Sequence, residues 1–232
     1  MAAQPDLTRM EIMYHIAPMP AQIDAATLAR LRQCEPATIG HFRDEGFLDP
    51  AIACRLEGAW IAGTAITLSL PPGDGVLLNH AMRLIRPGDV LVISQQGDMG
   101  HACWGGVLTE AAFIAGLAGV IIDGMATDIA AIRARRLPVW SRGLAARTTK
   151  MRDLGGAMNH PLAIGGVSIN AGDAVLADEN GVTVLPPGTL DATITRTLEL
   201  QEAEARLLQR LHAGEILPDI SGATAMIRAR KP

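Results

Sequence analysis

The chain has 232 residues, of which 49% are hydrophobic, with 20 Lys and Arg against 24 Asp and Glu. This size and composition can bury a core in one large or two small domains. The balance of charge leaves no basic footprint for a nucleic-acid backbone, and three Trp, one Tyr and three Phe give no stacking platform for single strands. The three cysteines have no paired spacing, so neither a disulfide framework nor a zinc site is indicated. The composition therefore excludes a nucleic-acid partner.

The first eighteen residues carry acids and lack a continuous apolar segment, so they do not resemble a secretory signal. The longest apolar window, residues 107–122, is interrupted by Glu110 and two glycines and is too short to span a bilayer. We therefore expect a soluble, cytoplasmic protein with no membrane partner.

The first third of the chain predicts two helices and a strand. Asp24 is a suitable N-cap for a helix that ends before Pro36, and a second short helix is expected near Thr38. Residues 60–70 alternate and are rich in β-branched side chains, which predicts a strand closed by a Pro-Pro-Gly turn.

The middle third predicts two β–α–β crossovers. Apolar strands are expected at 90–94, 119–123 and 138–141, with helices at 104–117 and 128–136 between them. Because these strands lack alternation, they should be buried on both faces of a parallel sheet.

The last third turns to strands and one long helix. Strands are expected at 162–169, 174–177 and 182–185, with a tight turn at 178–181. A charged helix over 189–213 should follow, with Gly214 near its C-cap. Since no linker-like stretch divides the chain, the sequence predicts one α/β domain over 1–232 with helical N- and C-terminal flanks.

A glycine-rich loop at 95–106 runs into the helix predicted after it. Free backbone N–H groups at the start of that helix would suit a phosphate or a carboxylate. The glycines form neither a dinucleotide fingerprint nor a P-loop, so nucleotide binding is unsupported. An ordinary connecting loop explains the same pattern equally well.

Two acids, Asp123 and Asp128, follow a predicted buried strand, where parallel sheets place their ligands. A carboxylate there can hold a hard cation such as Mg²⁺. The alternative is that Asp128 or Thr127 only caps the next helix, and the spacing alone favours the cap.

Four further residues are candidates from their local context. His41 and His101 could serve as ligands or bases, although a lone surface histidine is commoner. Arg142 and Arg147 follow a strand and could bind a carboxylate.

Several motifs in order resemble one family. They are Arg86-Pro-Gly-Asp-Val-Leu-Val, Ala102-Cys-Trp-Gly-Gly-Val-Leu, Gly119-Val-Ile-Ile-Asp-Gly, Thr127-Asp128, Pro138-Val-Trp-Ser-Arg-Gly and Gly172-Asp-Ala-Val-Leu-Ala-Asp-Glu-Asn-Gly. Over roughly residues 35–220 the chain resembles the RraA-like family, which includes 4-hydroxy-4-methyl-2-oxoglutarate / 4-carboxy-4-hydroxy-2-oxoadipate aldolases. The resemblance implies a swivelling β/α/β domain that assembles as a homotrimer or hexamer, with active sites between subunits.

The resemblance also implies a divalent-metal-dependent lyase. In the aldolase members Mg²⁺ or Mn²⁺ and helix N-terminal amides hold a 2-oxo acid, whose C–C bond breaks to leave a pyruvate enolate. Carried over by position, Gly105, Gly106, Val107 and Leu108 would bind the substrate. The metal ligands would be Asp128 and, from a neighbouring subunit, Glu204.

Three positions depart from the family pattern. Thr127 stands where the family has an arginine that binds the substrate carboxylate and orients the catalytic water. Gly106 stands where an acid often occurs, and His41 where an N-terminal acid reaches the metal through water. We hypothesise that His41 or His101 replaces the missing acid–base group and Arg142 or Arg147 the missing carboxylate clamp.

Two functions follow as hypotheses. The first is a lyase of the class II aldolase or decarboxylase type acting on a small 2-oxo or hydroxy acid, with His41, Thr127 and Arg142 as the catalytic candidates. The alternative is a non-catalytic regulator that binds and inhibits RNase E by protein–protein contact, which the missing arginine slightly favours. The intact glycine loop, Asp128 and Glu204 favour the enzyme.

Overall fold

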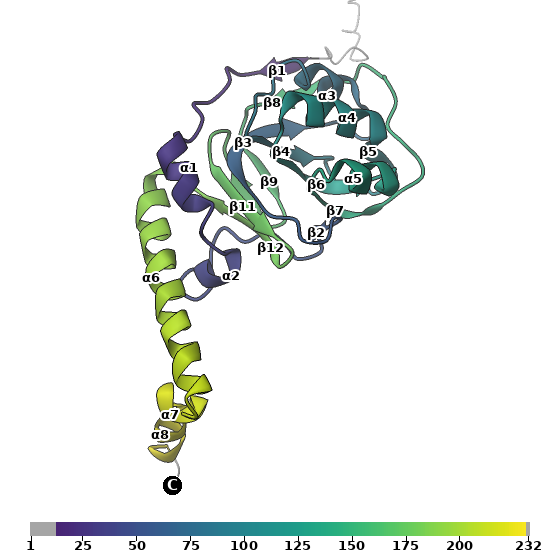
Figure 1. Ribbon diagram of the computed structural model, residues 1–232. Helices are drawn as coiled ribbons and strands as arrows, with labels where there is room; N and C mark the ends of the chain where they lie inside the picture. The colour runs from purple at the N-terminus through teal and green to yellow at the C-terminus, as the bar shows by residue number, and fades with distance from the viewer. Residues whose placement is uncertain (1–12, 231–232) are drawn as a thin grey trace, which may run out of the picture.

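The computed structural model describes residues 13–230, and its centre is a mixed sheet (Figure 1). Four long strands run parallel in the order β3-β4-β6-β7, as the two predicted crossovers require. These strands are β3 (Ile61–Ser69), β4 (Asp89–Ser94), β6 (Gly119–Ala126) and β7 (Val139–Leu144). Shorter strands extend the sheet: β8 (Gly156–Met158) and then β1 (Tyr14–Ile16) lie beyond β3, β2 (Ala53–Cys54) lies beyond β7, and β5 (Ala102–Trp104) pairs with the end of β6. The mixed α/β fold expected from the sequence is confirmed.

Three helices pack against one face of this sheet. They are α3 (Val76–Ala81), α4 (Gly106–Ala115) and α5 (Ile129–Arg135). Their apolar side chains, among them Leu78, Ala112 and Ile132, form one core with alternate strand residues such as Ile93 and Ile122. The intervening strand residues form a second core on the opposite face with the antiparallel pair β9 (Leu162–Ile164) and β10 (Val167–Ile169). Burial on both faces explains why these strands do not alternate in sequence.

The helical flanks form a third layer against a β-hairpin. The hairpin strands β11 (Ala174–Asp178) and β12 (Gly181–Leu185) pair with each other, and β11 pairs with β3. Against them pack α1 (Ala25–Leu31), α2 (Pro36–Ile39) and the start of α6 (Pro187–His212). Asp24 caps α1 as predicted, since its Oδ1 accepts from the backbone N–H groups of Ala26 and Thr27 at 3.0 Å.

Most of α6 leaves the body of the molecule (Figure 1). Its buried residues all lie in the first half: Leu190, Thr193, Ile194 and Thr197. The short helices α7 (Leu217–Ile220) and α8 (Ala223–Arg228) follow at its far end and contain no buried residue. We call the segment from residue 198 to 228 the C-terminal arm.

Three predicted elements differ from the structure. Residues 162–169 form a hairpin, not one strand, because Gly165 and Gly166 turn the chain with φ of +53° and +80°. Helix α4 begins at Gly106 after the short strand β5, not at Trp104. Strand β6 continues to Ala126, so Asp123 lies inside the strand and only Asp128 lies beyond it.

Among the helices of residues 13–230, none is long and apolar enough to cross a membrane. The prediction about a leader segment concerns mainly residues 1–12, which lie outside the described part. The predicted single domain likewise extends past it at both ends.

Candidate active site

Asp128 is held in an unusual backbone conformation between β6 and α5. Its φ of +52° and ψ of +43° are left-handed, a conformation that aspartate tolerates better than most residues. It occupies the N-cap position of α5, yet its side chain makes no capping bond there. Its Oδ2 instead accepts a hydrogen bond of 2.8 Å from the backbone N–H of Gly106, the first residue of α4. The simple cap favoured by the spacing is therefore wrong, and the carboxylate joins the starts of two helices.

The approach of Asp128 to α4 depends on Gly105. A Cβ at this position would lie 2.7 Å from Oδ2 of Asp128 and 2.9 Å from Cγ2 of Thr127. Both distances are shorter than ordinary van der Waals contacts, so no larger residue fits without movement. The glycine thus lets the strand end and the helix start close together.

A pocket of about 220 Å³ opens beside this contact. Its lining includes all the predicted substrate-binding residues and the predicted metal ligand of the same chain: Gly105, Gly106, Val107, Leu108, Thr127 and Asp128. The backbone N–H groups of Val107 and Leu108 lie in the first turn of α4, where an α-helix offers no partner of its own. The structure therefore brings together donors for an anion and a carboxylate that can hold a cation.

The opposite wall of the pocket comes from residues that sequence reasoning missed. Asn79 of α3 and Thr148 and Thr149 from the segment after β7 also line the pocket, and the remaining lining comes from β5: Ala102, Cys103 and Trp104. The backbone fixes this segment, because Thr149 N–H donates to the carbonyl of Ala102 at 3.0 Å and Lys150 N–H to that of Gly73 at 2.9 Å. These residues come from separate parts of the chain and form no local motif, so only the fold identifies them.

The buried side chain of Asp74 fixes the same segment through hydrogen bonds. It is 2% exposed, and its carboxylate accepts from the backbone N–H groups of Val76, Arg152 and Leu154 at 2.7–3.1 Å. Burial raises the pKa of this carboxyl, but the N–H donors outweigh burial and hold the pKa below its usual value. The charge of Asp74 therefore stabilises the wall that carries Thr148 and Thr149.

The glycine-rich loop is closed by its own aspartate. Asp98 accepts from the backbone N–H groups of Gly73 and Gly100 and from Nδ1 of His101, each at 2.8 Å. Burial raises the pKa of Asp98, but these donors outweigh burial and hold the pKa below its usual value. The backbone N–H of Gly100 thus bonds to a side chain of the loop itself, and strand β5 separates this part of the loop from the start of α4. His101 pairs with Asp98 and does not line the pocket.

Arg142 lies in an ion-pair cluster away from Asp128. Its Nη1 contacts Oδ2 of Asp49 at 2.7 Å, and its Nε donates to Asp123. These bonds, first to Asp123 and then to Asp49, raise the pKa of the guanidinium. Arg142 is not among the residues lining the pocket, and Arg147 is an exposed residue that is not among them either.

His41 and Glu204 also lie apart from the pocket of their own chain. His41 is exposed in the turn after α2, and Glu204 is exposed on the C-terminal arm. Figure 1 shows α2 and α6 on the side of the molecule away from α4 and α5. Their predicted roles stay predictions, and that of Glu204 requires a second copy of the chain.

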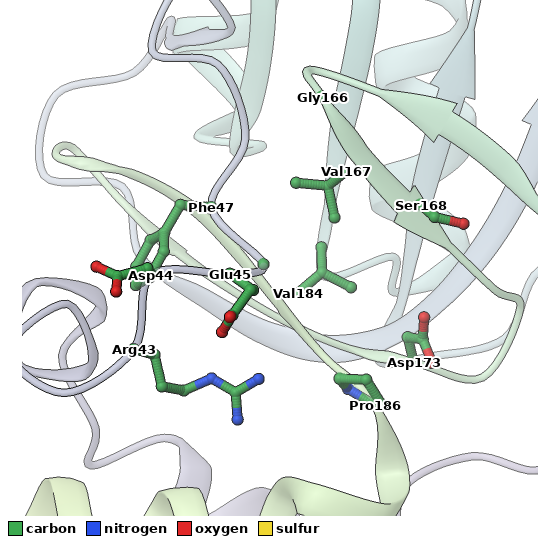
Figure 2. Close-up of a pocket in the computed structure, with 11 residues that line it drawn as sticks. Arg43, Asp44, Glu45, Phe47, Gly166, Val167, Ser168, Asp173, Val184 and Pro186 are labelled. Atoms are coloured by element: carbon green, nitrogen blue, oxygen red, sulfur yellow. The ribbon is translucent and has the colours of Figure 1, made fainter.

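A larger cavity, of about 450 Å³, lies between the loop after α2 and the β9–β10 hairpin (Figure 2). Its charged residues are Arg43, Asp44, Glu45 and Asp173. Asp173 is 4% exposed, and burial raises the pKa of its carboxyl because only one N–H, from Asn170, donates to it. Since this cavity contains none of the predicted site residues, the smaller pocket is the better candidate.

The chain is similar in sequence to known proteins. The family model for RraA-like proteins (Aldolase/RraA) matches residues 34–184. A protein of Halalkalibacterium halodurans, named as a candidate 4-hydroxy-4-methyl-2-oxoglutarate aldolase, is 34% identical over 151 residues, which are 65% of this chain and 71% of that protein.

Two solved structures share the fold. An uncharacterized protein of Pseudomonas syringae pv. tomato is 26% identical with a TM-score of 0.78, covering 89% of this chain and 98% of its own. RraAS2 of Streptomyces coelicolor, described as an unusual member of the RNase ES inhibitor RraA family, is 25% identical with a TM-score of 0.72, covering 82% and 97%. The residues that line the pocket, Gly105 and Gly106 among them, lie within the matched range, and the chain belongs to the RraA-like (Aldolase/RraA) family.

Proposed function

We propose that the protein is a divalent-metal-dependent carbon–carbon lyase acting on a small 2-oxo acid. The observation that carries this proposal is the common pocket of Asp128 and the free amides at the start of α4. A small carboxylate can accept from the amides of Val107 and Leu108 while a cation sits beside Asp128.

The donor set fits a hard cation with a water-rich shell. Among residues 13–230 there is no group of three or more His, Cys, Asp or Glu side chains that could hold a metal. Mg²⁺ needs only one or two protein carboxylates when waters and substrate oxygens fill its other positions, and Asp128 provides one. When bound, Mg²⁺ or Mn²⁺ would supply positive charge near the substrate oxygen on which negative charge develops.

The residues of the chain bind and orient the substrate. The amides at the start of α4 hold its carboxylate, and the Gly106 N–H fixes the direction in which Asp128 points. In a retro-aldol step a base takes the proton of the 4-hydroxyl, the bond between carbons 3 and 4 breaks, and its electron pair forms the enolate of pyruvate. Protonation of carbon 3 then gives pyruvate and an aldehyde or ketone.

We further propose a homo-oligomer in which another subunit completes this pocket. Helix α4 exposes Val107 (87%), Phe113 (51%) and Ile114 (76%), and the C-terminal arm exposes Leu208, Ile216, Leu217, Met226 and Ile227. Apolar surface of this kind is typical of protein interfaces. Glu204 on the arm would then reach the Asp128 of a neighbouring copy.

The test is release of pyruvate from 4-hydroxy-2-oxo acids and from oxaloacetate with Mg²⁺ or Mn²⁺. The variant Asp128→Asn keeps the shape of the side chain and removes its charge, so we expect loss of metal-dependent turnover. Asp191→Asn, an exposed carboxylate on α6, is the matched control and should retain activity. Absence of pyruvate from the unmodified protein across these substrates would refute the proposal.

The competing hypothesis is a regulator that inhibits RNase E by contact, and the similarity to RraAS2 supports it. A binding assay against RNase E distinguishes the two, because a regulator needs no metal and should bind equally well with Asp128→Asn. An enzyme should instead gain thermal stability with Mg²⁺ and lose that gain in the variant.

A further inference from the structure

The polar wall of the pocket is uncharged. Thr127, Thr148 and Thr149 contribute hydroxyls, and Asn79 contributes a side-chain amide whose Nδ2 donates to the carbonyl of Gly75 at 2.9 Å. Asp128 is the one charged residue of the lining. Apart from Asp128, the polar side chains of the lining are therefore hydroxyls and an amide, groups that can both donate and accept hydrogen bonds.

The candidate cationic side chains are paired with carboxylates or lie outside the lining. Arg142 is held between Asp49 and Asp123, so its guanidinium is already paired. Lys150 is exposed, and its Nζ donates to Oγ1 of Thr148 at 3.4 Å, outside the lining. Among the described residues, the lining therefore contains no guanidinium or ammonium group that could pair with a second carboxylate of a substrate.

The far end of the substrate lies in the same small pocket. With one substrate carboxylate on the α4 amides, the far end of a five-carbon acid must lie in a pocket of about 220 Å³. A carboxylate that loses its hydration there without a cationic side chain beside it is costly to bind, whereas a hydroxyl can bond to threonine and asparagine side chains.

From this lining we infer that the pocket selects 2-oxo acids with a single carboxylate and a neutral, hydroxylated far end. This inference rests on the proposed lyase function and adds its substrate class. Thr127 is the residue that determines this substrate preference, because its side chain lies beside both Gly105 and Asp128.

A matched substrate pair tests the inference. Cleavage of 4,5-dihydroxy-2-oxopentanoate gives pyruvate and glycolaldehyde, and cleavage of 4-hydroxy-2-oxoglutarate gives pyruvate and glyoxylate. The two substrates differ only in the far group, CH₂OH against carboxylate. We expect kcat/KM at least tenfold higher for the first, and a preference reversed by Thr127→Arg. Ala192→Arg adds the same charge on an exposed face of α6 and should leave the preference unchanged.

A binding measurement keeps the test independent of turnover. Neither 5-hydroxy-2-oxopentanoate nor 2-oxoglutarate carries the 4-hydroxyl needed for retro-aldol cleavage, so calorimetry with and without Mg²⁺ reports their affinity alone. At least tenfold tighter binding of the hydroxylated acid supports the inference even if no substrate is cleaved. Equal or tighter binding of 2-oxoglutarate, or a wild-type preference for 4-hydroxy-2-oxoglutarate, overturns it. Absence of pyruvate from both substrates and from oxaloacetate refutes the lyase proposal instead.

Discussion

Gly105→Ala should damage the site through one methyl group. The added Cβ would lie 2.7 Å from Oδ2 of Asp128, so the carboxylate has to move by roughly half an ångström or more to restore an ordinary contact. This movement weakens the bond from Gly106 N–H, which is 2.8 Å long in the native protein. The substitution therefore couples a local steric clash to the orientation of the proposed metal ligand.

The free energy of unfolding should fall by about 2 kcal/mol. Adding a methylene to a closely packed position costs roughly 1–3 kcal/mol. Loss of a hydrogen bond to a charged group costs about 1.5–3 kcal/mol, of which we count only the lower end because Asp128 is exposed to solvent. The two costs overlap, since the same movement relieves the clash and breaks the bond.

Urea unfolding and calorimetric titration with Mg²⁺ measure the two consequences. Gly188→Ala is the control, because a Cβ there meets no atom within 4 Å and lies in the first turn of α6. It should be neutral or slightly stabilising. Gly105→Ala with an unchanged urea midpoint and unchanged Mg²⁺ affinity would refute the close approach as the reason for the glycine.

Three further predictions concern buried charge and assembly. Because the pKa of Asp74 is lowered in the folded state, its contribution to stability is present above about pH 4, the unfolded pKa, and is lost as pH falls through the folded pKa. Asp74→Asn should therefore reduce the urea midpoint at pH 7 and weaken the loss of stability at acid pH, and an unchanged pH profile would contradict this. The pKa of Asp173 is raised by burial, so stability falls as pH rises from the pKa of the unfolded state to that of the folded state. Asp173→Asn should be more stable than the native protein at pH 7, and the difference should disappear near pH 3. A less stable variant at pH 7 would show that burial is not the main effect. Ile114→Glu on the outward face of α4 should reduce the assembly to smaller species in light scattering, with Ala130→Glu on exposed α5 as control, whereas an unchanged mass would remove this face from the proposed interface.

The sequence determined the local elements and the family. The apolar runs at 90–94 and 119–123 could be predicted as buried parallel strands because no alternation leaves a polar face. Gly105 and Asp128 were identified because the motifs around them are continuous in the chain. Their position at the end of a strand and the start of a helix is a local property that spacing can reveal.

Tertiary structure alone decided how these residues are used. Asp128 has the sequence context of a helix cap, and only the packing of α4 beside β6 gives its carboxylate a donor from another helix. Arg142 has the context of a substrate clamp, and only the fold shows that Asp49 and Asp123 pair with it. Thr148 and Thr149 reach the pocket from a segment without any motif, fixed by long-range backbone hydrogen bonds. Spacing along the chain specifies which helix or strand a residue belongs to, whereas the partner of a charged or polar side chain depends on segments brought together by folding.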